Sequence, residues 1–224
     1  MKQEMSILGI DIAKRVFHAV GMDERGKIVF RKRLSRHDLM PCIAKLPSVL
    51  IGIEACGGAH YWARRFREHG HEVKRMAPQF VKPYVKSNKN DSRDAEAIAE
   101  AVTRPTMRFV PIKDVDQQDI QALHRVRERL IGERTAWVHA VHGLMQEYGI
   151  VRPKGVSKFR QAVVEKLESE KDKLTALSQE RFWQLVEECA ALEKQLAYYQ
   201  EKLDTLATTH PECQRLLTIP GIGP

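Results

Sequence analysis

The sequence predicts an α/β protein in which a mixed sheet with flanking helices is followed by a long helical, coiled-coil region. Two observations predict this fold class. Short apolar runs alternate with helical stretches over residues 1–110, and leucines recur with heptad spacing in the second half. The length of 224 residues allows one large or two modest domains with buried cores.

The first three apolar runs predict three strands in series. Residues 6–11 form the first run, and residues 16–22 and 28–34 form the next two. Residues 23–26 lie between the second and third runs, and their acidic start and glycine end suit a hairpin turn. We therefore expect the three strands to pair antiparallel.

Helical and strand patterns then alternate. A helical stretch at residues 37–46 leads into a buried strand at 49–53, and a helix at 57–68 leads into a strand at 71–76. This order fits a mixed sheet with flanking helices. Pro78 and Pro83 mark a loop or short helix before the next element.

Residues 91–102 predict a helix rich in Ala and Glu, which Arg104 and Pro105 end. Residues 117–148 predict one long helix, in which four apolar residues recur every seven positions. A break at residues 149–155 separates it from a second helical region. The recurring residues of the long helix are Leu123, Leu130, Trp137 and Leu144.

The second helical region contains a cleaner heptad seam, sustained for more than three heptads. Such a seam needs a partner, which can be the first long helix or another subunit. We favour both, and therefore expect a homodimer, alone or within a higher assembly, rather than a hairpin that packs only within one chain. The seam residues are Phe182, Leu185, Cys189, Leu192, Leu196, Tyr199, Leu203 and Leu206.

Four acids are spaced along the first half as a two-metal nuclease needs them. Asp11 and Glu54 end apolar strand runs, while Asp91 and Asp94 lie three apart on one face of the predicted helix. A carboxylate at the end of a buried strand is costly unless something pairs with it. Singly, Asp11 suits a turn and the helical pair suits a cap and first turn. Together, the four favour a functional site.

Carboxylate oxygens are hard ligands that suit Mg²⁺ or Mn²⁺. Two such ions a few ångströms apart stabilise the attacking and leaving oxygens of a phosphodiester displacement. We therefore expect Asp11, Glu54, Asp91 and Asp94 to be both metal ligands and catalytic residues.

Basic residues are concentrated in the first half. Of the 37 Lys and Arg, 21 lie in residues 1–110, with only 12 of the 29 Asp and Glu. A surface that binds nucleic acid is therefore expected mainly on the first domain, extending into the basic stretch after it. The predicted contacts are Lys14, Arg15, Arg64, Arg65, Lys86, Lys89, Arg125, Arg127 and Arg129.

The cysteines and the apolar segments exclude several classes of protein. The four cysteines are scattered, with no spacing typical of zinc, and read as reduced cytosolic thiols. No segment reaches the ~18 apolar residues of a membrane span, and no signal peptide is recognisable. We expect a soluble protein of a prokaryotic cytosol or nucleoid that does not bind membranes.

Three stretches carry a family resemblance: residues 9–14, residues 53–57, and residues 89–99 with their D-x-x-D-A core. With these stretches in this order, the chain resembles the DEDD transposases of insertion sequences. These are relatives of the Piv and MooV invertases, now known as bridge-RNA-guided recombinases. The resemblance covers essentially the whole chain, and the third stretch is the most specific.

The resemblance implies a RuvC-like, ribonuclease-H-type catalytic domain over residues 1–110 and a coiled-coil dimerisation region over residues 111–212. It assigns the metal ligands to the same four acids. It implies that DNA is the substrate and that a structured guide RNA is a partner. It also implies a second catalytic domain with a serine nucleophile that joins covalently to DNA.

Residues 213–224 match only the start of that second domain. The family's serine would lie beyond Pro224, and Ser157, Ser169 and Ser178 match nothing in its motif. We therefore expect a truncated transposase or a fragment, which binds nucleic acid and metal but does not recombine DNA alone.

Two other functions stay open. A RuvC-like structure-specific endonuclease has the same fold and acids and needs no serine, so it would hydrolyse DNA in Mg²⁺ without further protein. A non-catalytic dimeriser that binds nucleic acid would keep its binding after Asp11→Ala.

Overall fold

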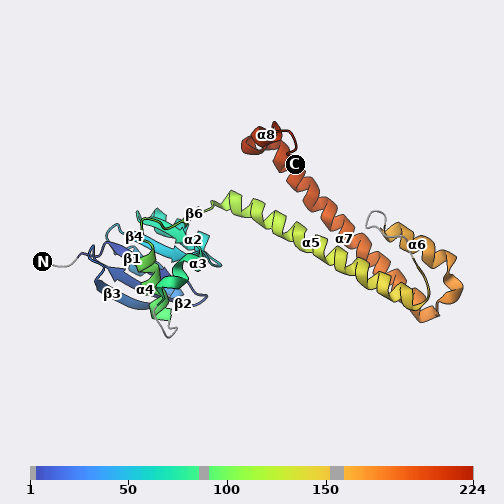
Figure 1. Cartoon of the computed structure of the whole chain (residues 1–224), viewed down its shortest axis with the longest axis horizontal. Helices are drawn as coiled ribbons and strands as arrows, with labels where there is room; N and C mark the ends of the chain where they lie inside the picture. The colour runs from blue at the N-terminus through green and yellow to red at the C-terminus, as the bar shows by residue number, and fades with distance from the viewer. Residues whose placement is uncertain (1–3, 86–90, 152–158, 224) are drawn as a thin grey trace. The chain divides into compact units, whose positions relative to one another are not determined.

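A computed structural model describes residues 4–85, 91–151 and 159–223 of the chain (Figure 1). It divides into two compact units, Met1–Val115 and Asp116–Pro224. In the described residues, no helix combines the length and the apolar character needed to cross a membrane.

The first unit is built on a six-stranded sheet with the strand order β3-β2-β1-β4-β5-β6. Strands β1 (Ile7–Asp11), β2 (Val16–Met22) and β3 (Ile28–Ser35) pair antiparallel in series, as the sequence predicts. The turn between β2 and β3 is closed by Asp23, whose carboxylate accepts hydrogen bonds from the backbone amides of Arg25 and Lys27.

The remaining strands extend the sheet on the other side of β1. Strand β4 (Leu50–Glu54) pairs parallel with β1, and β5 (Glu72–Met76) pairs parallel with β4. Strand β6 (Phe109–Val110) pairs antiparallel with β5. The predicted mixed sheet is confirmed. Strand β6 is not predicted, because two residues are too few to show a period of two.

Helices cover both faces of the sheet. Helices α1 (Arg36–Ile43) and α2 (Ala59–Glu68) cover one face, where Leu39 and Phe66 join the largest apolar cluster. Helix α4 (Asp91–Ala101) crosses the other face, as Figure 1 shows. The short helix α3 (Pro78–Val81) and the 3₁₀ turn η1 (Lys82–Tyr84) precede α4.

Helix α4 packs directly on the backbone of two central strands. A Cβ added to Gly9 of β1 would lie 2.2 Å from the carbonyl oxygen of Ala95 and 2.4 Å from the amide nitrogen of Ala99. A Cβ added to Gly52 of β4 would lie 2.9 Å from the Cβ of Val102. Side chains at these two positions would push α4 off the sheet, so the two glycines set its distance.

The second unit is helical. It contains most of α5 (Val115–Glu147), then α6 (Phe159–Ser169) and the 3₁₀ turn η2 (Lys171–Lys173). Gly149, two residues after the end of α5, has a φ of 68° that disfavours other residues and stops the helix. Two more helices complete the unit: α7 (Ala176–Thr209) and α8 (Pro211–Leu217).

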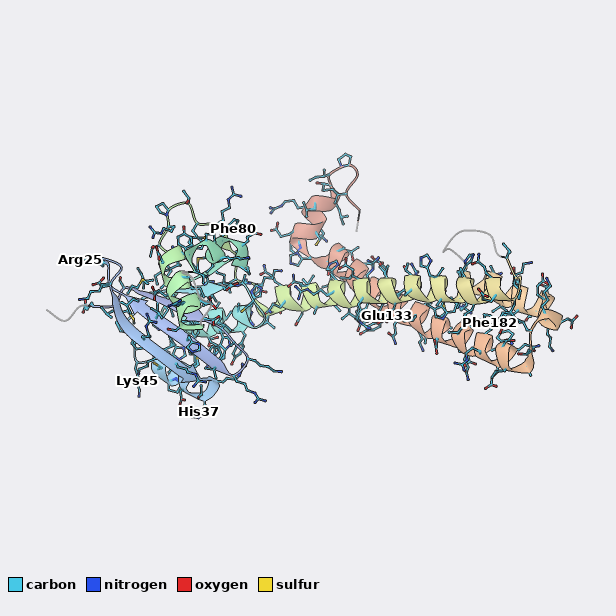
Figure 2. The ribbon with its side chains drawn as sticks, turned by 60° about the horizontal axis from the view of Figure 1, so that its bottom comes forward. Arg25, His37, Lys45, Phe80, Glu133 and Phe182 are labelled. Carbon is cyan, nitrogen blue, oxygen red and sulfur yellow. The ribbon has the colours of Figure 1, made fainter. Side chains whose placement is uncertain are left out.

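Helices α5 and α7 pack against each other through apolar residues of both (Figure 2 labels Glu133 on α5 and Phe182 on α7). Trp137 and Val141 of α5 share one cluster with Phe182 and Cys189 of α7. All eight members of the predicted seam are buried or half-buried within one chain, and Phe182, Cys189 and Leu196 are the buried ones.

The predicted stripe on α5 is correct at three positions and wrong at the fourth. Leu130 and Trp137 are buried and Leu123 is half-buried, but Leu144 is 43% exposed and its neighbour Met145 is 1% exposed. An α-helix turns once every 3.6 residues, so a strict seven-residue repeat drifts by about 20° per heptad around its axis. By the third repeat the buried face has moved on by one residue.

Candidate metal and nucleic-acid site

The two strand-end acids lie side by side at one edge of the sheet. Strands β1 and β4 are parallel neighbours, with Ile10 in register with Ile53. Asp11 and Glu54 are the next residues of the two strands, and both are half-buried. Two adjacent strands therefore end in carboxylates at the same position along the strand direction.

Both acids lie on the face of the sheet that α4 covers. Side chains alternate between the faces of a strand, so Asp11 shares its face with Gly9, and Glu54 shares its face with Gly52. Helix α4 touches both glycines. The intervening Ile10 and Ile53 belong to the cluster on the opposite face.

The first turn of α4 points to the same edge. Ile98 and Val102, at its other end, pack against Ile7 and Leu50 at the amino ends of β1 and β4. Because α4 runs antiparallel to these strands, its first turn lies toward their carboxyl ends. Asp94 is half-buried and directly precedes Ala95, which contacts Gly9. Asp11, Glu54 and Asp94 therefore share one face and one edge.

The fourth predicted ligand is only partly visible. Asp91 is the first residue of α4, but its side chain lies outside the described residues. Within the described ranges, no three His, Cys, Asp or Glu side chains lie close enough together to hold a metal ion. The donor set itself, three carboxylates with a fourth acid at the same helix end, is of the type that Mg²⁺ and Mn²⁺ prefer.

The thiol of Cys56 reports the negative charge of this edge. Cys56 follows β4, and its Sγ lies 3.7 Å from the carbonyl oxygen of Ile12, which follows β1. Burial of the sulfur raises the pKa of Cys56, and the nearby carboxylates of Glu54 and Asp11 raise it further. The sequence shows Cys56 only as one of four scattered cysteines.

A buried arginine on the other face holds the segment that leaves the sheet. Arg75 of β5 is 5% exposed, and its guanidinium donates to the carbonyl of Pro111 (2.8 Å) and to Nδ1 of His60 (2.9 Å). The same Nδ1 accepts the amide N–H of Lys113 at 2.9 Å, so the proton of this imidazole is on Nε2. Desolvation lowers the pKa of Arg75.

Arg75 and His60 are missed by sequence reasoning, because nothing in their surroundings marks them as buried. Arg64, a predicted nucleic-acid contact, also joins this network and donates to the carbonyl of Lys113 at 2.7 Å. At least one of its N–H groups is therefore engaged inside the protein, and its contact with nucleic acid stays a prediction.

The other predicted contacts of the first unit differ in their surroundings. Lys14 and Arg15 are exposed in the connection from β1 to β2, beside the acids. Arg65 is half-buried and pairs with Glu68 at 2.7 Å. Lys86 and Lys89 lie outside the described residues.

The predicted contacts of the second unit lie on α5. Arg125 is exposed. Arg127 donates from Nε to the side chain of Gln200 on α7 at 2.6 Å, and Arg129 pairs with Glu133 one turn along α5. Among the contacts of the described residues, Arg127 and Arg129 have these side-chain partners and Arg125 has no such partner. All three contacts with nucleic acid stay predictions.

Comparison with known proteins gives one family and several relatives. A model of the DEDD transposases of IS110, described as a transposase, matches residues 8–150. The transposase for insertion sequence element IS1111A of Coxiella burnetii is 42% identical over 99% of this chain and 61% of its own length. A probable family 20 transposase of Pseudomonas aeruginosa is 42% identical over 98% of this chain and 65% of its own length.

A third relative, the transposase for insertion sequence element IS1328 of Yersinia enterocolitica, is 40% identical over 98% of this chain and 65% of its own length. The chain thus spans less than two thirds of the length of these relatives. Among solved structures, T. thermophilus RuvC in complex with a Holliday junction substrate is similar to 48% of this chain. It is matched over its full length, with a TM-score of 0.37 and 13% identity.

Proposed function

The chain belongs to the DEDD transposase family of IS110, and from that premise we propose that its four acids act on DNA phosphodiesters with bound divalent metal ions. Asp11, Glu54, Asp91 and Asp94 would be the ligands, and Mg²⁺ or Mn²⁺ the metals. When bound, such ions stabilise charge on the attacking and leaving oxygens of the phosphodiester. The biological role that we propose is transposition of an insertion sequence.

One observation carries the proposal: Asp11, Glu54 and Asp94 lie on one face, at one edge of the sheet. Carboxylates at one edge of a sheet repel one another, and this repulsion costs free energy unless a cation offsets it. A divalent cation bound between the carboxylates would offset this repulsion. Cys56 lies at the same edge, where burial raises its pKa and the carboxylates of Glu54 and Asp11 raise it further.

Metal binding by the whole chain tests the proposal directly. Protein stripped of metal is titrated with MnCl₂ in a calorimeter. We expect wild type to bind, and Asp94→Asn and Asp11→Asn to bind at least about ten-fold more weakly, as ligand loss predicts. Glu72→Gln is the matched control, because Glu72 is an exposed strand acid at the amino end of β5, away from the site. Failure of wild type to bind Mn²⁺ or Mg²⁺ would contradict the proposal.

The structure-specific endonuclease is the second candidate, because the same acids serve it and it needs no serine. A four-way DNA junction incubated with this chain in Mg²⁺ separates the two functions. Cleavage by the chain alone, lost in Asp11→Asn, would favour the endonuclease. Binding without strand exchange is expected if the chain acts as a transposase only with a serine-bearing domain, which the resemblance implies.

The partners that we propose are DNA, a structured guide RNA and a second copy of the chain. DNA follows from the family, and the RNA from the resemblance alone. The homodimer is supported by large apolar side chains that stay exposed on the long helices, among them Leu144 on α5 and Trp183 and Tyr198 on α7. Light scattering after size-exclusion chromatography tests the dimer. A monomer at all concentrations would contradict it.

A further inference from the structure

A single row of side chains runs across the sheet through the two strand-end acids. Asp11 of β1 is paired with His18 of β2, and His18 is paired with Arg33 of β3. Residues directly opposite each other on neighbouring strands lie on the same face of a sheet. Arg33 and His18 therefore lie on the face of Asp11 and Glu54, at the level of Asp11.

The contacts of Arg31 confirm which face this is. Arg31 is two residues before Arg33 on β3, so the two share a face. Its guanidinium donates to the Oγ of Ser92 at 2.6 Å and pairs with the carboxylate of Glu96 at 2.9 Å, both on α4. Arg33 lies one step nearer the edge and is exposed. It lies at the end of β3 that leads to His37 and away from the turn at Arg25, both labelled in Figure 2.

The row is closed on its other side. Glu54 is paired with Met76 of β5, which is 0% exposed. Met76 packs in an apolar cluster with Val81 of α3 and Ala97 and Ile98 of α4. A phosphate cannot displace this core, so access past Glu54 toward β5 is blocked by packed apolar side chains.

The side toward β2 and β3 is open and basic. Lys14 and Arg15, in the connection between β1 and β2, are exposed at the same edge, and the backbone carbonyl of Arg15 accepts from Arg36 just after β3. Neighbouring strands are about 4.8 Å apart, so Arg33 lies roughly 10 Å from Asp11 across the sheet. An arginine side chain extends over much of this distance and binds phosphate oxygens in a bidentate manner.

We infer that Arg33 anchors the nucleic-acid strand next to the acidic site, by binding a phosphate that is not cleaved, and that the strand reaches the acids across β2 and β3. This inference rests on the proposed function for the identity of the reacting phosphate. It adds that the strand approaches over β2 and β3, that Arg33 contacts it, and that the side toward β5 is blocked. His18 lies between the anchor and Asp11 along this path.

A comparison of two neighbouring residues tests the inference. Arg33→Gln removes the cation of the row, and Lys32→Gln removes an equal charge from the next residue of the same exposed strand. Lys32 is paired with Ala19, on the face that α1 and α2 cover, and its Nζ lies 5.5 Å from the centre of the Phe30 ring. Both variants lower the net charge equally, so a difference in their affinity for DNA cannot come from the net charge alone.

Affinity for a fluorescent duplex DNA is measured at several salt concentrations, with Ca²⁺ in place of Mg²⁺ to prevent cleavage. We expect Arg33→Gln to lose about ten-fold in affinity and about one unit of salt slope, and Lys32→Gln to change little. Equal losses in the two variants, or a larger loss in Lys32→Gln, would overturn the inference. Thermal unfolding of both variants is measured alongside, and both exposed substitutions should leave it unchanged.

Titration of the same variants with MnCl₂ separates this inference from the proposed function. The anchor predicts unchanged Mn²⁺ binding in Arg33→Gln. If wild type binds no metal but Arg33→Gln still loses DNA affinity, the metal proposal fails and the anchor stands. If metal binds and the DNA affinity of Arg33→Gln equals that of wild type, the anchor fails and the metal proposal stands.

Discussion

The sheet unit and the helical unit bury apolar surface in different ways. In the sheet unit, both faces are covered by helices, and α4 rests on the backbone of Gly9 and Gly52. In the helical unit, each long helix packs along one stripe, and the glycines of α5, Gly132 and Gly143, have open space where a Cβ would be added. A helix thus packs on strand backbone in the first unit, and helices pack through side chains in the second.

This difference is consistent with the place of the candidate site in the sheet unit. Catalytic groups must be held within a fraction of an ångström, which needs elements that cannot shift. A sheet with a helix packed directly on its backbone provides this, and the acids lie at its edge. A helix pair with one apolar stripe instead leaves large side chains exposed, which suits contacts with other chains.

Gly9→Ala should give the largest effect, because it breaks the closest packing in the sheet unit. The new Cβ would meet the backbone of α4 at 2.2 Å, and backbone atoms cannot rotate away. We expect a loss of about 3 kcal/mol or more in the free energy of unfolding of this unit. Urea denaturation followed by the fluorescence of Trp62, in a variant without the other two tryptophans, measures it. A midpoint equal to that of the parent would show that α4 is not held so closely.

Met145→Ala and Leu144→Ala sharpen the comparison within the helical unit. Met145 is buried in the cluster between α5 and α7, so its truncation should cost about 2–4 kcal/mol. Leu144 is exposed, and its truncation should cost about 0.5 kcal/mol or less. Thermal and urea unfolding at low protein concentration give both values. A larger loss for Leu144→Ala than for Met145→Ala would support the strict seven-residue stripe and contradict the packing of α5.

Gly143→Ala should have a smaller effect, of opposite sign to that of Gly9→Ala. Gly143 is exposed near the C-terminal end of α5, and nothing lies within 4 Å of the Cβ that alanine would add. Alanine favours a helix over glycine by about 1 kcal/mol, so the variant should be stabilised by up to this amount. The same unfolding measurements apply. A destabilised variant would indicate that this side of α5 is covered by another chain.

A pH series should give the smallest effect, and only in the sheet unit. His71 is buried between β4 and α1, where its Nδ1 accepts from the amide of Val49 and its Nε2 donates to the carbonyl of Ile43. Burial lowers the pKa of His71 below its ordinary value of 6.5. The unfolded chain then binds a proton more readily than the folded one, so the stabilisation is complete above pH 6.5 and is lost as the pH falls below it.

The free energy of unfolding, measured from about pH 7.5 to about pH 5, gives this dependence, because these values bracket the ordinary pKa of histidine. His71→Gln should flatten the profile of the sheet unit, because it removes the buried imidazole. A profile that His71→Gln does not alter would assign the pH dependence to other groups.

The strand pattern was simpler to predict than the buried face of the long helix, for a geometric reason. Side chains of a strand alternate with a period of two, and strand β2 was predicted with its observed bounds, 16–22. The helical period is not a whole number, and the seven-residue stripe therefore failed at Leu144. The second helical region of the prediction contains three helices, α6, α7 and α8. The breaks between them, at the 3₁₀ turn η2 and at Pro211, lie outside the heptad pattern, so that pattern does not reveal them.

The basic residues show what a sequence leaves open at the site. Arg64 and Arg75 look alike in the sequence, as exposed cations would, yet both donate to backbone carbonyls of the segment after β6. Arg33 looks no different from Lys32, and only the register with His18 assigns it to the face of the acids. A guanidinium forms either kind of contact equally well, so composition cannot separate them.

The sequence by itself determined the fold class, the family and the four candidate acids, because these depend on local patterns: strand periodicity, turn residues and three short motifs. The tertiary structure decided that β1 and β4 are neighbours and that Asp11 and Glu54 lie on the face that α4 covers. It also decided that the buried Met76 borders the candidate site on one side and the exposed Arg33 on the other. Those facts depend on strand order and register between segments far apart in the chain, which no local pattern contains.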